Sequence, residues 1–440
     1  MPRYITWVRA HISTAQRVAT SRLVHRFNFG PRPGQYLEML QRGVEATQTS
    51  VLEHGVADPG LNSLPTPSLP NLGPIPAPNA SNVSTFWNTL YANQSELVLW
   101  WLDRMALADY PLTERMTWFW HGHWATSNSK VFYPLTMQRQ NNTLRRYALA
   151  NFGDMARAMV VDGALNYWLD NEDNYLSSPN ENLARELMEL MTIGVNNFTQ
   201  RDVTAAARAL TGYSTYQPTG AVTFDAQQHY SKPLTILDKT ARYDAQSLAS
   251  LLVSTDFNAK FITDRMWFRF VSGTTKPPPA LEGSFARRDI YALVDSLARS
   301  SAWNDPANSL VKSPVEWFIG ACRATKVRPS TLTANALQWC LEQMGQVPFN
   351  PPNVGGWPYG QAWLSGVAFQ YRFEVTELLM TKADLSPISV PKSKMVQACA
   401  DWLGVPEWSR RTANALDGVS DNPSDFVTLA LLSPEYAVSV

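Results

Sequence analysis

The chain has 440 residues, of which 37 are Lys or Arg and 37 are Asp or Glu, so its formal net charge at pH 7 is zero. This balance leaves no overall positive field to attract nucleic acid or an anionic membrane, and it disfavours both as partners. Hydrophobic residues make up 45% of the chain and include 16 Trp, enough to build large cores, so the composition excludes a largely disordered protein.

The N-terminal part, residues 1–56, predicts two helices within residues 15–53, separated by the Gly/Pro-rich stretch FNFGPRPGQ. Residues 57–85 are proline-rich and almost uncharged, which predicts an extended strap that lies against the surface. We expect residues 86–372 to form a main helical domain and residues 373–440 to form a C-terminal helical segment packed on it.

Within the main domain, apolar periodicity predicts helices over residues 86–109, 113–120, 135–150, 154–167, 179–193 and from Thr199 onward. Thr199 is the expected N-cap of the last of these, with Asp202 at N3. Residues 215–240 predict a short β-hairpin from VTFD and PLTILD. Helices return over residues 244–272, 285–300, 314–324 and 332–344. The fold class is therefore mainly α: a large multi-helical bundle-like body with long loops and at most a small β-hairpin.

The cysteines, the apolar runs and the N-terminal stretch indicate the cellular compartment that the sequence predicts. Cys322, Cys340 and Cys399 have no C-x-x-C spacing, so we expect buried free thiols rather than disulfides or a zinc–thiolate site. No apolar run approaches the ~20 residues that span a bilayer. The basic N-terminal stretch lacks the continuous apolar region of a secretory signal, so the sequence as it stands predicts a cytoplasmic protein.

A histidine pair is the most concentrated chemical feature of the sequence. His121 and His123 stand one residue apart in WHGHW, although the whole chain has only six histidines. In an extended segment, residues i and i+2 point to the same side, so the pair could offer two imidazoles to one metal ion. The alternative is a helix-to-loop junction in which both rings bond to backbone carbonyls among the tryptophans.

Several stretches together resemble a known bacterial family. They are RLVHRFNFGP, ERMTWFWHGHWATS, PNENLARELMELMTIGVNNFTQRDVTAAARALTGY, SPVEWFIGACRA and PPNVGGWPYGQAWL, and the resemblance spans about residues 22–372 in this order. The chain is similar to the family named only as domain of unknown function 1800. The resemblance implies that the polar residues of these stretches matter, and it implies no particular reaction. Many relatives resemble exported proteins with a leader.

The PNEN stretch supplies candidate acid/base residues. Ser178 and Pro179 predict a helix start, with serine as N-cap and proline at the first helical position. Helical spacing then places polar residues on one face, and the expected catalytic residues are Glu181, Arg185, Glu186 and Glu189. Glu186 is the expected metal ligand or general base. A solvated surface face with a Glu181–Arg185 ion pair is the ordinary alternative.

His229 would add a third imidazole in FDAQQHYSKP, a segment that also resembles a family stretch. Three histidines and a carboxylate suit a divalent metal such as zinc, iron or copper. We expect the substrate to be bound by aromatic and polar residues near these segments, namely Trp120, Trp124, Asp170, Asn182, Lys232 and Trp357. Each has an ordinary alternative: aromatic packing for the tryptophans, and loop hydrogen bonding for the polar residues and for His229.

These observations favour an enzyme that uses a metal or a carboxylate/histidine pair for acid–base chemistry. Hydrolysis of a polar substrate such as a glycoside is the preferred reaction, with Glu186 and a neighbouring carboxylate as the catalytic pair if no metal binds. One alternative is a non-catalytic scaffold whose Trp-rich surface binds carbohydrate or protein, and another is a redox metalloprotein. The phosphate-binding P-loop, the dinucleotide-binding G-x-G-x-x-G and the G-x-S-x-G elbow are all missing from the sequence.

Overall fold

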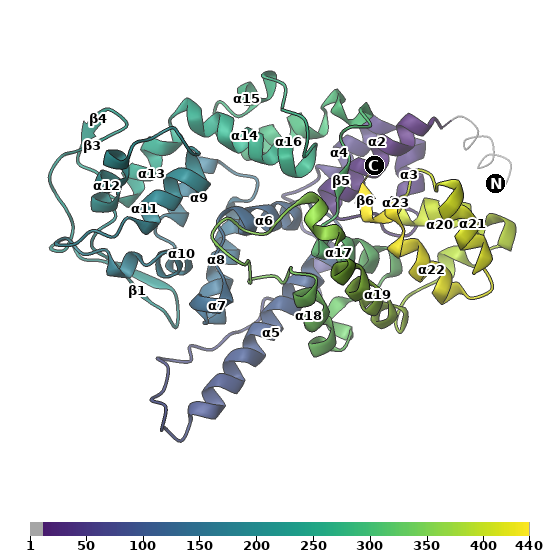
Figure 1. The fold of residues 1–440 in the computed structure, drawn as a ribbon, viewed down its shortest axis with the longest axis horizontal. Helices are drawn as coiled ribbons and strands as arrows, with labels where there is room; N and C mark the ends of the chain where they lie inside the picture. The colour runs from purple at the N-terminus through teal and green to yellow at the C-terminus, as the bar shows by residue number, and fades with distance from the viewer. Residues whose placement is uncertain (1–11, 440) are drawn as a thin grey trace.

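The computed structural model describes residues 12–439, which fold into packed helices with a few short strands (Figure 1). The mainly α class is confirmed. The chain begins with α2 (Thr14–Asn28), α3 (Gln35–Arg42) and α4 (Val44–Val51). The second half of α2 is buried on every side, polar residues included, so this helix lies inside the molecule rather than on its surface.

The proline-rich segment and the helix that follows it project from the body in Figure 1. After the short η1 (Pro59–Leu61), the segment runs without regular structure to α5 (Val83–Leu107). Leu64 and Leu69 are buried, and Pro67 accepts a hydrogen bond from Gln138 at 2.8 Å, so the strap lies against the protein.

The helices of the central region surround α6, which spans Leu112–His123. This helix does not end at residue 120, as its apolar periodicity predicts, but continues through the histidine pair. The other elements are α7 (Asn128–Val131), α8 (Pro134–Tyr147), α9 (Phe152–Met159), α10 (Gly163–Trp168), η2 (Asn171–Asp173), α11 (Asn182–Glu186), the π-helical η3 (Leu187–Thr192) and α12 (Gln200–Ala209).

Two local predictions in this region have opposite outcomes. The expected N-cap of α12 is confirmed, because Thr199 and Asp202 form a reciprocal capping box. The expected start of the PNEN helix at Pro179 is wrong, because α11 begins at Asn182.

Within residues 12–439, the strands form three small antiparallel pairs. β1 (Tyr213–Tyr216) pairs with β2 (Ala221–Phe224), and β3 (Leu234–Ile236) pairs with β4 (Lys239–Ala241). VTFD and PLTILD therefore belong to two separate hairpins rather than to one. β5 (Leu310–Val311) pairs with β6 (Val438–Ser439), which brings the last described residues into the middle of the fold.

The remaining helices complete two large hydrophobic cores within residues 12–439, and a small third cluster joins Phe86, Leu90 and Tyr133. One core includes α2, α6, α9, α13 and α16, and the other includes α5 and α17 to α22. The remaining bounds are α13 (Ala245–Val253), α14 (Asp256–Phe270), α15 (Ala280–Ser284), α16 (Ile290–Ala298), η4 (Ser301–Asn304), α17 (Pro314–Thr325), η5 (Pro329–Thr331), α18 (Ala334–Gln343), η6 (Gly360–Leu364), α19 (Gly366–Met380), η7 (Ser386–Ile388), α20 (Lys392–Leu403), α21 (Arg410–Gly418), α22 (Pro423–Leu432) and α23 (Pro434–Ala437).

Helices from the two ends of the sequence lie beside each other, as α20 packs on α3 (Figure 1). The division into four segments stays a prediction. Over residues 12–439, no helix is long and apolar enough to cross a membrane. The three cysteines are free and buried, as expected.

Candidate functional site

The histidine pair lies on the last turn of α6, so the expectation of an extended segment is wrong. Side chains at i and i+2 of a helix point about 200° apart, because each residue turns the helix by about 100°. His121 and His123 therefore face different surroundings and bind different partners. The pair does not present two imidazoles to one point.

His121 is a buried hydrogen-bond acceptor in an aromatic cage. Its Nε2 accepts a hydrogen bond from the backbone N–H of Phe349 at 3.1 Å, which places the ring proton on Nδ1. The rings of Trp101, Trp118 and Trp357 surround it, with centroids 5.3, 6.3 and 5.4 Å away. Burial lowers the pKa of His121 to about 3, so the imidazole is neutral at physiological pH.

His123 connects α6 to the PNEN stretch through the backbone. Its Nε2 lies 2.9 Å from the carbonyl oxygen of Met191 and donates to it. Burial lowers the pKa of His123, and the charge of Arg265 lowers it further. The Met191 carbonyl belongs to η3, a π-helical segment whose wider turns are often found at functional sites. The two predicted segments thus meet, but by a structural hydrogen bond rather than through the glutamates.

His229 lies elsewhere, after the first hairpin. Its Nδ1 is 3.0 Å from the carbonyl oxygen of Thr211, and its ring packs on Phe224. Lys232 is exposed. Across residues 12–439, no group of three or more His, Cys, Asp or Glu side chains is arranged to hold a metal ion. The divalent-metal cofactor stays a prediction.

The polar face of the PNEN helix is half-buried. The expected ion pair is present, with Arg185 Nη2 3.0 Å from a Glu181 carboxylate oxygen that also accepts from Gln200. Burial raises the pKa of Glu186, and the charge of Glu189 raises it further. In Figure 1 this helix, α11, lies on the opposite side of α6 from β5, β6 and α17.

The structure brings together two of the residues expected to bind substrate. Asn182 Nδ2 lies 3.5 Å from an Asp170 carboxylate oxygen, and Asp170 also forms an ion pair with Lys130. Asp170 adopts a left-handed backbone conformation with φ of 56°. This is a polar loop cluster at the start of α11.

The three tryptophans expected to bind substrate are core residues. Trp120 donates from Nε1 to the carbonyl oxygen of Ala148 at 2.9 Å, and Trp124 is fully buried. Trp357 is buried and stacks on Trp118 with centroids 4.8 Å apart. Their aromatic faces are used in packing.

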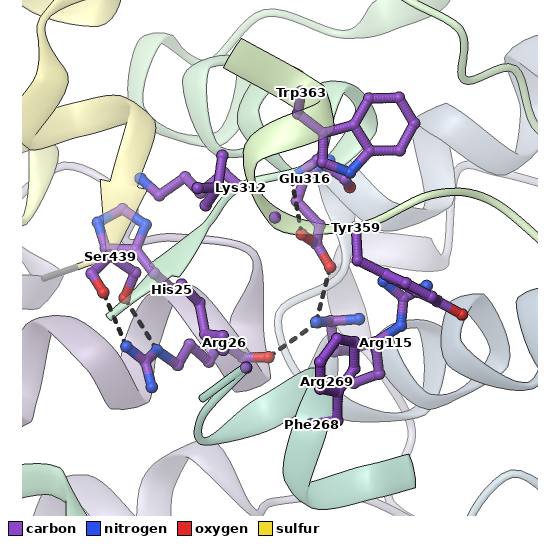
Figure 2. A pocket seen from close by; sticks show the side chains of 15 residues that line it. His25, Arg26, Arg115, Phe268, Arg269, Lys312, Glu316, Tyr359, Trp363 and Ser439 are labelled. Carbon is purple, nitrogen blue, oxygen red and sulfur yellow. Dashed lines mark hydrogen bonds and ion pairs between the residues drawn. The ribbon is translucent and has the colours of Figure 1, made fainter. Parts of the chain in front are cut away.

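A different cavity collects the charged residues that sequence analysis left unassigned (Figure 2). This basic pocket lies where α2, α6, α14, β5, α17, η6 and β6 converge, and it has a cavity volume of about 70 Å³. Its lining residues are His25, Arg26, Arg115, Phe268, Arg269, Gly273, Leu310, Val311, Lys312, Ser313, Glu316, Tyr359, Gly360, Trp363 and Ser439. A water needs roughly 10–15 Å³ of such volume, so the cavity has room for several waters or one small ion.

Two of the pocket's cations are held by hydrogen bonds or an ion pair to protein groups. Arg26 donates to the backbone carbonyls of Val271 and Ser439, both at 2.7 Å, and thereby fastens β6 to α2. Arg115 forms a 2.7 Å ion pair with Glu316 and donates from Nε to the Arg26 carbonyl. Glu316 also accepts from the Ser313 backbone N–H at 3.0 Å as part of the α17 capping box.

The other two cations, Arg269 and Lys312, have no hydrogen-bond acceptor or ion-pair partner within residues 12–439. The Arg269 guanidinium lies over the ring of Tyr359, 3.6 Å from its centroid, and the Lys312 ammonium lies over the ring of Tyr436 at 3.8 Å. Burial lowers the pKa of both groups. Aromatic faces stabilise these cations but leave their N–H donors unused.

The pocket draws on four of the five stretches that carry the family resemblance. They supply His25 and Arg26, Arg115, Ser313 and Glu316, and Tyr359 to Trp363, whereas the PNEN stretch supplies no lining residue. Sequence analysis missed these charged residues because no local spacing connects them. The only hint in the sequence is that most of these residues lie in the stretches that resemble the family. Lys312 and Arg269 lie outside those stretches.

The comparisons with known proteins agree with the resemblance. The family model described as "Protein of unknown function (DUF1800)" matches residues 22–438. Neither the curated proteins nor the solved structures that were searched gave a match. Because the family model covers nearly the whole chain, the protein belongs to the DUF1800 family.

Proposed function

We propose that the basic pocket binds a small anion or the anionic group of a larger ligand, such as a carboxylate, phosphate or sulfate. The observation that carries this proposal is the charge of the cavity wall. Three arginines, Arg26, Arg115 and Arg269, face a single carboxylate, that of Glu316, which leaves two positive charges uncompensated by the lining residues whatever the charge of Lys312. His25 adds no charge, because burial lowers its pKa and the charge of Lys312 lowers it further.

The arrangement of these charges favours a ligand rather than a purely structural role. Arg26 and Arg115 use their donors to hold protein groups, whereas Arg269, which also lines the cavity, has no hydrogen-bond acceptor among residues 12–439. An enclosed, uncompensated cation is costly, and an anion that accepts its hydrogen bonds removes much of that cost. Phe268, Tyr359 and Trp363 line the same cavity and would contact an apolar part of the ligand.

Isothermal titration calorimetry tests this function. The purified full chain would be titrated with inorganic phosphate, sulfate and acetate in a buffer free of competing anions. We expect saturable binding of at least one, weakened at least about tenfold by Arg269→Met, because a charge-assisted hydrogen bond contributes about 1.5–3 kcal/mol.

Arg146→Met is the matched control, since Arg146 is exposed and its loss changes the net charge equally. Equal weakening in both variants would reduce the effect to general electrostatics and contradict a specific site. No binding of any anion to the folded wild-type chain would refute the proposal. The acid–base hydrolase, the carbohydrate-binding or protein-binding scaffold and the redox metalloprotein stay predictions from the sequence.

A further inference from the structure

Large aromatic side chains are exposed where α18 and α19 pack together at the surface. Trp339 on α18 is 53% exposed, and Phe369 and Phe373 on α19 are 51% and 44% exposed. The two phenylalanines stand four residues apart, so they occupy one face of α19. Single exposed apolar residues are ordinary on protein surfaces, but a group of large ones on packed helices marks an interaction site.

Two hollows flank α19, which lies between α18 and α22 (Figure 1). Trp339, Glu374 and Glu377 line the hollow on the α18 side, which has a volume of about 510 Å³. Phe373, Glu377 and Asp425 line the hollow on the α22 side, which has a volume of about 360 Å³. Because Glu377 lines both, the hollows adjoin, and each is large enough for side chains rather than for a single small ion.

The charged residues that line the two hollows are all acidic. They are Glu374, Glu377 and Asp425, and none of them forms an ion pair within residues 12–439. Glu374 accepts a hydrogen bond from Gln370 at 3.4 Å, and Asp425 accepts one from Asn422 at 2.9 Å, so both donors are uncharged. The negative charge beside the aromatic rings is therefore not compensated by the chain itself.

The nearest lysine in the sequence does not change this charge. Lys382, two residues after the end of α19, is exposed but lines neither hollow. We call the surface around the two hollows the acidic aromatic face, and it consists of Trp339, Phe369, Phe373, Glu374, Glu377 and Asp425.

We propose that the acidic aromatic face binds a basic amphipathic helix of a partner protein. The grooves beside α19 run between packed helices, and a groove of this kind accepts the apolar side of a further helix. Lysine or arginine side chains of that helix would contact the carboxylates and the exposed face of Trp339. This face shares no lining residue with the basic pocket, so the proposal is independent of anion binding.

The charge of the face disfavours two other occupants. A second copy of the chain joined by this face in a symmetric dimer would bring identical carboxylates together, and like charges repel. The surface of an anionic membrane would repel them as well. A cationic helix is the occupant that compensates the charge and covers the aromatic rings at the same time.

Fluorescence anisotropy tests the proposal. The full chain would be titrated into a dye-labelled peptide of about 18 residues, with leucine and lysine on opposite sides of a helix. We expect saturable binding that Trp339→Ala weakens at least about tenfold, because buried aromatic residues dominate the binding energy of interfaces. Phe257→Ala is the matched control, since Phe257 is 47% exposed but lies on α14, away from these helices (Figure 1).

The charge of the face has its own test. Glu377→Gln should weaken binding of the lysine peptide by about twofold to fivefold, and added salt should reduce this difference, because exposed ion pairs are screened. Glu53→Gln is the control, since Glu53 is exposed elsewhere on the chain, and it should have no effect. Equally tight binding of a peptide with glutamate in place of lysine would contradict the charge complementarity.

The remaining outcomes identify a different occupant or none. Absence of saturable binding of the lysine peptide would refute the proposal, whatever the anion titrations give. A dimer in light scattering that Trp339→Ala dissociates, or cosedimentation with phosphatidylcholine vesicles that this variant abolishes, would overturn it in favour of a second copy or a lipid surface. Because the lysine and glutamate peptides are compared on the wild-type chain, the test remains decisive if Trp339→Ala fails to fold.

Discussion

Replacement of His121 by glutamine should make the protein less sensitive to mild acid. The histidine acts as a neutral acceptor for the Phe349 N–H inside an aromatic cage, and a glutamine oxygen can accept the same hydrogen bond. The folded-state pKa of His121 is about 3, against an ordinary value of 6.5. Because the folded value is the lower one, His121 stabilises the protein above pH 6.5, and this contribution is lost as the pH falls toward 3.

The size of the effect follows from the two pKa values. One unit of pKa difference corresponds to about 1.4 kcal/mol. Between pH 7.5 and pH 5, the histidine protonates only in the unfolded chain, and pH 5 lies about 1.5 units below its unfolded pKa of 6.5. The free energy of unfolding of the wild type should therefore fall by about 2 kcal/mol more than that of the glutamine variant. The other buried histidines are common to both proteins, and their contributions cancel in the comparison.

Urea unfolding followed by tryptophan fluorescence measures this difference. The free energy of unfolding would be determined for wild type and His121→Gln at pH 7.5 and at pH 5. An equal loss in the two proteins would refute the description of His121 as a buried neutral acceptor. A glutamine variant less stable at pH 7.5 is compatible with the reasoning, because the prediction concerns only the pH-dependent part.

Other perturbations test the framework around the pocket. Glu114 is buried between Arg104 and Arg145, and Glu114→Gln should lower the free energy of unfolding by about 3–5 kcal/mol, because both arginines lose their shared carboxylate. Urea unfolding at pH 7 measures this change, and a decrease below about 1 kcal/mol would contradict the prediction. Burial alone would raise the pKa of Glu114, but the two arginines lower it to about 2, so the stability it contributes should fall between pH 4.5 and pH 2. Gly356→Ala should destabilise the protein, because its Cβ would lie 2.3 Å from the Gly122 carbonyl oxygen and its φ is +82°. A Cβ at Gly122 would meet no side chain closer than 3.7 Å, so Gly122→Ala should be neutral or stabilising by up to about 1 kcal/mol. Thermal unfolding of both alanine variants compares them, and an unchanged melting temperature in Gly356→Ala would be inconsistent with this packing.

Local chemistry in the sequence predicted some element boundaries and missed others. Thr199 and Asp202 form the expected cap because both partners lie within four residues. Pro179 does not open its helix, because the backbone N–H of Asn180 bonds to the Asn174 side chain and that of Asn182 bonds to the Asn180 side chain. Asparagine side chains here satisfy backbone donors that a helix would otherwise leave open, and they delay its first turn.

The end of α6 shows why the apolar periodicity of the sequence did not predict that the histidine pair is helical. Almost every residue of α6 is buried, charged ones included, so the helix lacks the polar face that would reveal its 3.6-residue period. The basic pocket could not be predicted for another reason. Arg26, Arg115, Arg269 and Lys312 come from separate parts of the sequence, and only packing brings them to one cavity. The sequence contains these charged residues, but no local pattern in it shows that they line one cavity.

The contact between Arg26 and Ser439 has a consequence for how the protein is made. The two residues are separated by 413 positions, yet the hydrogen bonds between them form part of the pocket wall. A ribosome adds about 5–20 residues per second, so α2 must wait tens of seconds for β6 to be synthesised. During that interval the Arg26 guanidinium lacks its Ser439 partners. A nascent chain in this state would expose an incomplete pocket wall to chaperones and proteases, and the basic pocket could not be completed before β6 is made.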